Sequence, residues 1–360
     1  MPEFFLNGFF AFYRAVLVLI GIVYPAGKNN ANRGVRNERY PGPHGGATPV
    51  KIFYPRKSIR QTIILYPGAS PYAEEHPAMK TVGGALARAG YLVFIPRIPP
   101  LKDLIITEDL IGWMICFYKW VLRRRDVNPK HVSLVGMSFG GALVLKMLIK
   151  PEVRKHPPKS VLVYGSFYDI NTAFEFLLTG KMTINGKTVT ITPNEWGVIV
   201  LFHNFLGKVD VGYNTDNVQR ILALRVKDLL EESITESKKL SGKERALAEA
   251  LLKSKPTPEV RRITTLIREQ CKPDLERLSP KSWCHRIDMK VFVMHGANDS
   301  MSPFTESIKL AASLKNSRLL ISYLYKHREI STDRGFLFRT KELLRLLSFL
   351  CAFMRCNDSA

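Results

Sequence analysis

The sequence has few cysteines and few acidic residues. Its five cysteines in 360 residues are an odd number, and no Cys-x-x-Cys pair occurs. This argues against a disulfide framework or a zinc site, and it indicates a reducing compartment. Asp and Glu total 31 against 53 Lys and Arg, so the formal net charge at pH 7 is +22. Such an imbalance favours contact with anionic surfaces such as phospholipid headgroups or nucleic acid.

Motifs for cofactors and for nucleic acids are also missing. No glycine-rich phosphate loop is present, since Gly83-Gly84 falls within a helix-like stretch. The loop that contains Glu74, Glu75 and His76 offers no further metal ligand at a suitable spacing. We therefore expect no cofactor and no metal. The basic stretch 28–60 has few interleaved aromatic residues and no known binding motif, so we expect no nucleic-acid partner.

The amino terminus is apolar. Residues 4–24 have about the length that spans a bilayer, and neither a preceding basic residue nor a following cleavage site marks a signal peptide. Asn7, Arg14 and Gly21 recur at a seven-residue interval, which places them on nearly one face of a helix. Such a helix can span a membrane, lie in its interface or dock on the protein.

The basic residues that follow favour the membrane. We expect residues 1–27 to form a membrane anchor or an interfacial helix, and residues 28–48 to form a basic linker arm. If the helix spans, the positive-inside rule puts the domain that follows it on the cytoplasmic side. An anionic membrane surface is then a partner of this protein. The alternative is a soluble cytoplasmic protein.

From residue 49 onward, short apolar runs alternate with helical stretches, the pattern of a parallel sheet with helices on both faces. The expected strands are 50–54, 62–66, 91–95, 132–135, 160–164, 290–294 and 319–324. The alternation fails between residues 164 and 290, an interval far longer than a crossover needs and mainly helical in pattern. We interpret residues 166–288 as a cap subdomain inserted between two parts of a core, 49–165 and 289–360.

A Gly-x-Ser-x-Gly string stands between an expected strand and an expected helix. It reads Gly136-Met137-Ser138-Phe139-Gly140. In this context the serine occupies a strained turn that exposes its hydroxyl and tolerates only small residues two positions away. The helix behind it offers its positive amino-terminal end to a developing anion. The string therefore predicts Ser138 as a nucleophile, with Gly136 and Gly140 as the glycines of its turn.

A serine hydroxyl needs a base to remove its proton, and a carboxylate usually orients that base. Asp299 follows the expected strand 290–294, and His327 follows the last expected strand, in the chain order Ser, Asp, His. No other histidine comes after Asp299. We assign His327 as the general base and Asp299 as the acid. Asp169, just after the strand that ends at residue 164, is the alternative acid.

The segments GMSFGG and HGANDSMSP, together with the late His327, resemble the α/β-hydrolase superfamily. The resemblance implies the α/β-hydrolase fold, a mostly parallel sheet flanked by helices, with the mainly helical cap inserted before the penultimate strand. It also implies an oxyanion hole made of two backbone N–H groups. Phe139 supplies one, and Ala69, in the turn after strand 62–66, supplies the other. Ser70 is the alternative second donor.

These residues predict a serine hydrolase that cleaves a carboxylic ester through an acyl-enzyme on Ser138. A helical cap, an apolar amino-terminal helix and a basic face suit a lipid or acyl ester, so the expected partner is a small-molecule or lipid ester substrate. A thioesterase, an acyltransferase or a peptidase uses the same triad. A non-catalytic binding protein built on the same fold is a further alternative.

Overall fold

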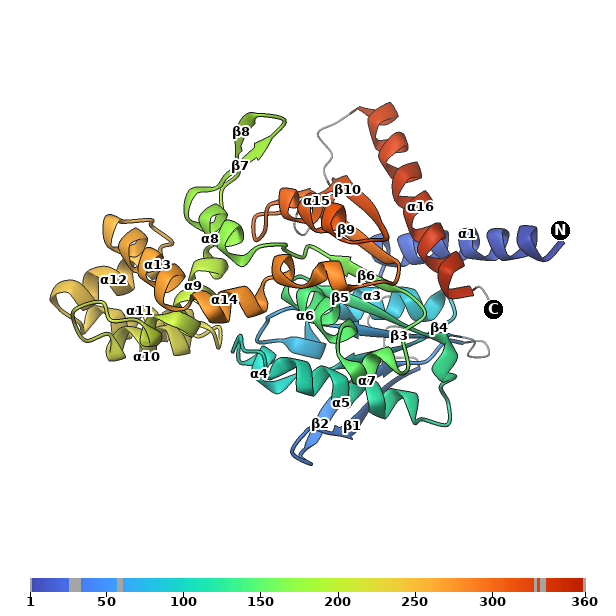
Figure 1. Ribbon diagram of the computed structural model, residues 1–360, viewed down its shortest axis with the longest axis horizontal. Helices are drawn as coiled ribbons and strands as arrows, with labels where there is room; N and C mark the ends of the chain where they lie inside the picture. Colours follow the sequence, from blue (N-terminus) through green and yellow to red (C-terminus); the bar gives the residue numbers. More distant parts are fainter. Residues whose placement is uncertain (1, 26–33, 57–60, 327–328, 331–334, 359–360) are drawn as a thin grey trace.

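A nine-stranded sheet forms the centre of the molecule, whose computed structural model describes residues 2–25, 34–56, 61–326, 329–330 and 335–358 (Figure 1). Its strand order is β1-β2-β4-β3-β5-β6-β9-β10-β11. The six strands from β4 to β10 in this order pair in parallel, whereas β1, β2 and β11 pair antiparallel. The mostly parallel sheet expected from the sequence is confirmed. The strands are β1 (Val35–Pro41), β2 (Ala47–Phe53), β3 (Gln61–Tyr66), β4 (Tyr91–Pro96), β5 (Val132–Met137), β6 (Val161–Tyr164), β9 (Val291–Asn298), β10 (Ser317–Lys326) and β11 (Glu329–Ile330).

Helices cover both faces of this sheet. Because successive side chains of a strand point to opposite faces, Ile63 and Leu65 of β3 join the core beneath α1, α3 and α16, whereas Ile64 and Tyr66 join the core beneath α5 and α6. Burial on both faces explains why the strands are continuous apolar runs. The helices outside the insert are α1 (Pro2–Val23), α3 (Pro77–Arg88), α4 (Pro99–Lys102), α5 (Leu110–Leu122), α6 (Phe139–Leu148), α7 (Pro151–Arg154), α15 (Phe304–Ser313) and α16 (Phe336–Asp358).

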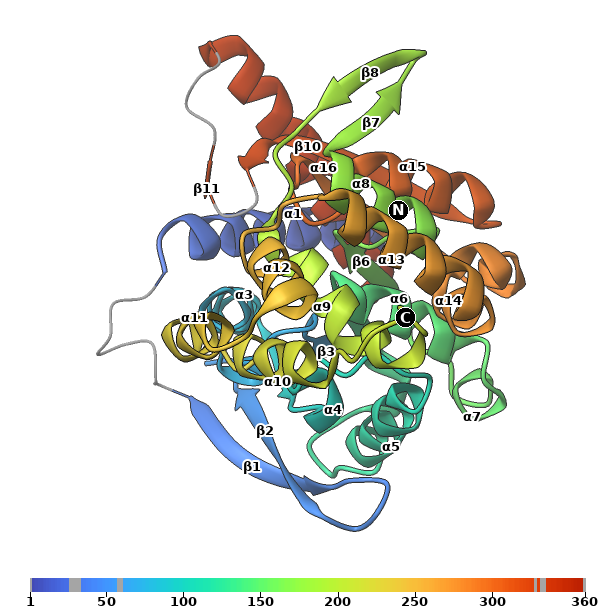
Figure 2. The same cartoon turned by 90° about the vertical axis from the view of Figure 1, so that its left-hand side faces the viewer.

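The chain between β6 and β9 forms a mainly helical insert, whose helices stand in front of the sheet in Figure 2. It contacts loops that follow the parallel strands. The N–H of Asn194 donates to the carbonyl of Ser300 after β9 (2.8 Å), and the side chain of Asn204 accepts from the N–H of Ile106 after β4 (2.7 Å). Its elements are α8 (Ile170–Thr179), β7 (Lys181–Ile184), β8 (Lys187–Thr190), α9 (Glu195–Phe205), α10 (Asp216–Arg225), α11 (Leu230–Lys238), α12 (Gly242–Leu252), α13 (Pro258–Gln270) and α14 (Lys272–Leu278).

Two left-handed turns shape the insert. Asn185 (φ 48°) and Gly186 (φ 76°) join β7 to β8, as expected of an Asn-Gly pair in a type I′ turn. The sequence also predicts one helix over residues 218–232, and this is wrong. The structure has two helices, α10 and α11, with a break at Asp228, whose φ is 65°. A residue in this conformation cannot continue a right-handed helix.

The stretch expected as a linker arm, residues 28–48, contains an edge strand instead. β1 pairs antiparallel with β2 along its whole length. Its Tyr40 is buried, and the Tyr40 hydroxyl donates to the carbonyl of Arg97 (2.6 Å). Most of its other side chains are exposed, the charged Arg36 and Arg39 among them, as is usual at sheet edges. Those charges made the segment look like a linker in the sequence. Residues 26–33 lie outside the described residues.

Helix α1 packs on the domain, on α3 and α16. Its Ala11 and Ala15 are fully buried. Gly21 lies so close to α3 that an added Cβ would fall 2.8 Å from the Cβ of Ala85. Of the three arrangements open to this helix, the structure has the docked one. Within the ranges that the structure describes, no helix is long and apolar enough to cross a membrane.

Candidate active site

Ser138 occupies the turn between β5 and α6. Its φ of 50° and ψ of −125° lie outside the ordinary regions for a residue with a side chain, and its side chain is exposed. The N–H of Ser138 donates to the carbonyl of Tyr164 at the end of β6 (2.6 Å), which holds the turn against the neighbouring strand. The result is the strained, exposed serine that the sequence pattern predicts.

The two glycines of this turn are required by close backbone approach. A Cβ on Gly136 would lie 2.7 Å from the Cα of Gly141, and a Cβ on Gly140 would collide with the carbonyl group of Pro67. Both obstacles are backbone atoms, which cannot move aside as a side chain can. The spacing of glycines around Ser138 therefore has a steric cause.

The loop after β3 lies beside the nucleophile turn. A Cβ built on Gly68 would stand 3.1 Å from the Cβ of Ser138, and the next residue is Ala69. Across the turn, Phe139 is the first residue of α6, where N–H groups have no partner inside the helix. The two segments expected to supply the oxyanion donors are thus adjacent. Ser70 is engaged in a local turn, where its Oγ accepts from the N–H of Tyr72 (3.3 Å).

Asp299 follows β9 and is 4% exposed. Its Oδ1 accepts hydrogen bonds from the N–H groups of Met301 (2.7 Å) and Ser302 (3.2 Å), so the loop holds this oxygen in place. Its Oδ2 lies near Gly165, which follows β6, since a Cβ there would be 3.4 Å away. Because β5, β6 and β9 are neighbours in the sheet, Asp299 lies at the same edge as Ser138.

His295 contacts the loop that follows β9 and contains Asp299. It is completely buried, its Nδ1 is 2.7 Å from Ser307 Oγ, and its Nε2 is 3.0 Å from the carbonyl of Ser302. The carbonyl can only accept, so Nε2 carries a proton. That same Nε2 is 3.6 Å from Asp299 Oδ2. His295 therefore has a structural part in holding the acid loop.

Asp169, the alternative acid, is engaged elsewhere. Its side chain caps α8 by accepting from the N–H of Asn171 (3.0 Å). Its second oxygen pairs with Lys281 Nζ at 3.0 Å, and this hydrogen bond raises the pKa of Lys281. Both carboxylate oxygens thus serve the packing of the insert, which favours Asp299 as the acid.

His327, the expected base, lies outside the described residues. The strand before it, β10, ends at Lys326 and runs parallel to β9, the strand that leads to Asp299. In the part of the chain that the structure describes, no three His, Cys, Asp or Glu side chains lie close enough together to hold a metal ion.

Two contacts near the turn had no sequence signal. The rings of Phe139 and Phe167 stack with their centroids 5.7 Å apart. The hydroxyl of Tyr72, in the loop after β3, donates to the carboxylate of Asp228 in the insert. Each joins segments far apart in the chain, which no local pattern reveals.

The sheet order, its antiparallel edge at β1 and β2, and the strained serine between β5 and α6 together decide the fold. This chain has the α/β-hydrolase fold. No protein-family model matches the sequence, and no curated protein matches it either.

Solved structures similar to this α/β-hydrolase include enzymes of several kinds. A 2-hydroxy-6-oxo-6-phenylhexa-2,4-dienoate hydrolase from Rhodococcus sp. strain RHA1 is 18% identical, with 87% of this chain and 98% of that chain covered and a TM-score of 0.45. A serine hydrolase from Cycloclasticus zankles is 15% identical, with 89% and 99% covered and a TM-score of 0.47. The fold assignment rests on the sheet and the turn rather than on these similarities.

A longer protein is also similar. The acylaminoacyl peptidase of Pyrococcus horikoshii is 12% identical over 80% of this chain, with a TM-score of 0.45. The present chain spans 36% of that peptidase's length. A second crystal form of the same peptidase is covered to 40%. The similarity concerns a part of that protein only.

Proposed function

We propose that this protein is a serine hydrolase that cleaves a carboxylic ester, with a lipid or acyl ester as its substrate. The observation that carries this proposal is the exposed Ser138 in a left-handed turn at the start of α6. Backbone strain of this kind costs about 1–3 kcal/mol and persists at sites where it serves function. An inert serine in a loop has no need of it.

In the proposed reaction, Ser138 Oγ attacks the carbonyl carbon of the ester while His327 takes the hydroxyl proton. The bond to the alcohol oxygen then breaks, and His327 returns the proton to that oxygen. Water attacks the resulting acyl-enzyme by the same route and releases the acid. Asp299 orients the imidazole and stabilises its protonated form. The fixed geometry of the Asp299 carboxylate, held by two backbone N–H groups, supports this part.

The negative oxygen of the tetrahedral intermediate needs two donors. We assign these to the backbone N–H groups of Phe139 and Ala69, with Ser70 as the alternative to Ala69. The approach of the Gly68 backbone to Ser138 supports the pairing of these two segments. Loss of one such donor typically lowers turnover by about 10²–10³-fold.

The substrate class is inferred from the surroundings of Ser138. The stacked rings of Phe139 and Phe167, 8% and 7% exposed, make the packing directly beside the nucleophile apolar. The insert acts as a cap in this proposal, because Asn194 and Asp228 bind the loops that follow β9 and β3. An apolar wall under a cap suits an acyl chain better than a charged substrate.

Labelling with a fluorophosphonate probe tests the chemistry. We expect the intact protein to be labelled, Ser138→Ala to lose the label, and Ser241→Ala, which changes an exposed serine of the insert, to keep it. An unlabelled but folded protein would point to the non-catalytic binding alternative.

Two further assays define the reaction class. Hydrolysis of p-nitrophenyl esters of increasing chain length tests the substrate, and we expect higher kcat/KM for long chains than for acetate. Activity on short soluble esters together with no activity on long-chain esters would refute the lipid proposal. Parallel assays with thioesters and peptides, and product analysis with added alcohol, separate ester hydrolysis from the thioesterase, peptidase and acyltransferase alternatives.

A further inference from the structure

Helix α1 is apolar on its exposed side as well as on its buried side, unlike an ordinary surface helix. Its one charged residue after Glu3 is Arg14, which faces the domain, where its Nη1 donates to Gln61 Oε1 (3.0 Å). Its outward face is formed by large apolar side chains. Four of these, together with Tyr24 just after the helix, are between 50% and 74% exposed: Phe9, Phe12, Tyr13, Ile20 and Tyr24. We call these five residues the aromatic arc.

The aromatic arc is continuous along the helix. Its members follow one another at spacings of one, three, four and seven residues, which keeps them on one side of an α-helix. No charged residue interrupts this side between Phe9 and Tyr24. Scattered apolar residues on a surface are normal, but a contiguous stripe of this kind marks a site of contact with a membrane or another protein.

The arc lies at the amino edge of the sheet, opposite Ser138. Gln61, the partner of Arg14, is the first residue of β3, and Tyr91, whose ring lies 5.4 Å from the Arg14 guanidinium, is the first residue of β4. Ser138 follows the carboxyl end of β5. Figure 1 shows the same separation, with α1 at one end of the molecule and the insert at the other.

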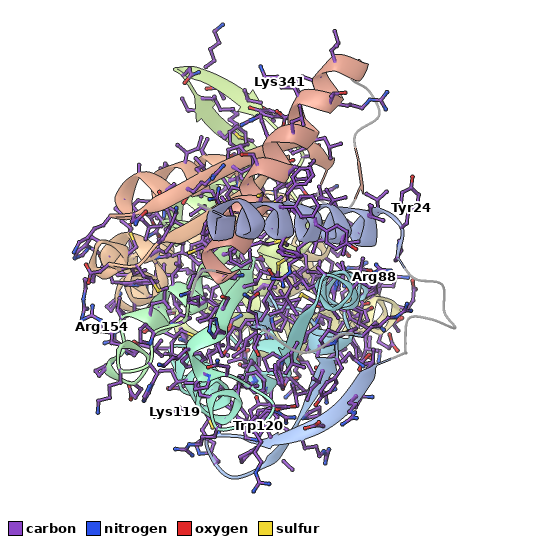
Figure 3. The ribbon with its side chains drawn as sticks, turned by 90° about the vertical axis from the view of Figure 1, so that its right-hand side faces the viewer. Tyr24, Arg88, Lys119, Trp120, Arg154 and Lys341 are labelled. Atoms are coloured by element: carbon purple, nitrogen blue, oxygen red, sulfur yellow. The ribbon has the colours of Figure 1, made fainter. Side chains whose placement is uncertain are left out.

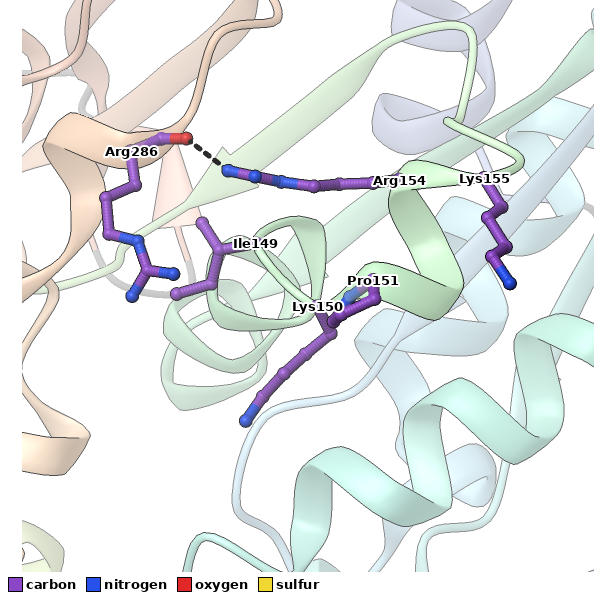
Figure 4. Close-up of a pocket in the computed structure, with 6 residues that line it drawn as sticks. All are labelled: Ile149, Lys150, Pro151, Arg154, Lys155 and Arg286. Atoms are coloured by element: carbon purple, nitrogen blue, oxygen red, sulfur yellow. Dashed lines mark hydrogen bonds between the residues drawn. The ribbon is translucent and has the colours of Figure 1, made fainter.

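A cationic cavity opens at the same edge. It has a volume of about 630 Å³, and its lining residues are Ile149, Lys150, Pro151, Arg154, Lys155 and Arg286. Figure 4 shows how these side chains lie around it; the guanidinium of Arg154 donates to the carbonyl of Arg286 (3.0 Å). Four of the six residues are cationic and none is acidic. The cavity belongs to the amino edge because α7 precedes β6 and Arg286 precedes β9.

Two acids near the cavity are already paired, one of them with Lys150 of the cavity itself as well as with Lys146. Glu108 accepts from Lys146 at 3.1 Å and lies 3.7 Å from Lys150. Asp288 pairs with Lys315 at 2.5 Å. The remaining positive charge at the cavity is therefore available to an anion from outside. Figure 3 looks onto this side of the molecule, where α1 lies between Arg154 on the left and Arg88 and Tyr24 on the right.

We propose that this amino-edge face binds an anionic lipid bilayer. The aromatic arc of α1 enters the boundary between headgroups and acyl chains, and Arg154, Lys155 and Arg286 contact lipid phosphates. Aromatic and apolar side chains beside cationic ones are the chemistry of interfacial helices. The carboxyl edge with Ser138 then faces away from the bilayer, so this contact tethers the protein and does not depend on the proposed hydrolase activity.

Charge favours a bilayer over a second copy of the chain. Two copies meeting at this face would bring together two proteins of net charge +22, each with its cationic cavity. Like charges at such an interface oppose association. Anionic headgroups neutralise the same charges while acyl chains cover the arc.

Co-sedimentation of the full chain with vesicles tests the arc. We expect binding to vesicles of phosphatidylcholine mixed with phosphatidylglycerol. The triple variant Phe9→Ser, Tyr13→Ser, Ile20→Ser should lower the partition coefficient by about tenfold or more, because interfacial binding scales with buried apolar area. The matched control Ile105→Ser, Leu229→Ser, Leu230→Ser changes three exposed apolar residues outside α1 and should bind as the wild type does. Thermal unfolding checks that each variant is folded.

A second pair of variants tests the cations. Arg154→Gln with Arg286→Gln should weaken binding to mixed vesicles by about thirtyfold, at roughly 1 kcal/mol per cation near an anionic surface. Lys239→Gln with Arg245→Gln removes two charges from the insert and should have no effect. Three results overturn the proposal: no binding of wild type to mixed vesicles, equal binding of the serine triple variant, or a dimer in sedimentation velocity that this triple variant dissociates. Retention on DNA without binding to vesicles would overturn it as well.

Discussion

Arg14, in the middle of an apolar helix, donates a hydrogen bond from Nη1 to the side-chain oxygen of Gln61 at 3.0 Å. Gln61 in turn donates from Nε2 to the carbonyl of Asn357 at 2.9 Å, near the end of α16. The side chain of Asn357 accepts from Ser133 Oγ at 2.8 Å. A polar chain therefore joins α1, α16 and the amino-terminal ends of β3 and β5. Helix α1 is held by this chain as well as by apolar packing.

Replacing Arg14 should destabilise the whole domain. In Arg14→Ala the side-chain oxygen of Gln61 loses its donor in a partly buried setting, and we expect a loss of about 1–3 kcal/mol in the free energy of unfolding. The matched control is Arg36→Ala, whose exposed guanidinium lies 4.7 Å from the ring of Tyr54 and should cost at most about 1 kcal/mol. Urea unfolding measures both. Equal stability of Arg14→Ala and wild type would mean that the hydrogen bond from Arg14 to Gln61 contributes nothing measurable to stability.

The turn at Ser138 should tolerate no methyl group at Gly140. The added Cβ would strike the Pro67 backbone, so Gly140→Ala should lose more than about 2 kcal/mol of stability or fail to fold. Gly112→Ala is the control, because Gly112 lies in α5 with no atom within 4 Å of its Cβ position. At this position alanine should increase the stability of the protein, by at most about 1 kcal/mol. In thermal unfolding we expect a lower melting temperature than wild type for Gly140→Ala and a higher one for Gly112→Ala. Similar losses in both variants would contradict the steric account.

Much of the sheet follows from sequence because buried parallel strands must be continuous apolar runs. The seven runs identified in the sequence became β2, β3, β4, β5, β6, β9 and β10. Strand β1 escaped because most of its side chains, Arg36 and Arg39 among them, are exposed at the edge of the sheet, so it is not a continuous apolar run. The break between α10 and α11 escaped too, because it rests on a left-handed Asp228; aspartate adopts this conformation more often than most residues with a side chain, but most aspartates do not adopt it.

Some features of the candidate site could likewise be predicted from the sequence, and others could not. The glycines around Ser138 and the position of Asp299 after a strand are local signals, and the sequence carried them. The contact between Tyr72 and Asp228 joins residues 156 positions apart and has no local signal. The orientation of α1 escaped for a different reason. A helix with one polar stripe can face either way, and the outcome depended on Gln61, a partner that the helix sequence does not contain.

The choice between two acids can be decided by a pair of amide variants. Asp299→Asn should lower kcat by about 10³–10⁴-fold, as loss of the orienting carboxylate does in serine hydrolases. Asp169→Asn should keep most activity, since Asp169 caps α8 and pairs with Lys281. Ester hydrolysis with folded proteins measures both. The reverse order of effects would make Asp169 the acid.

Acid should weaken the protein partly through His203. Burial lowers the pKa of this imidazole below its ordinary value of 6.5, although a hydrogen bond to the backbone of Asp103 opposes the shift. The folded protein therefore holds His203 neutral at pH values where the unfolded chain already binds a proton. Stability is unaffected well above pH 6.5 and falls as the pH drops through that value toward the lower folded pKa. In His203→Gln this part of the loss should disappear. Urea unfolding at about pH 7.5 and about pH 5.5 measures it, and an equal loss in both proteins would contradict the assignment.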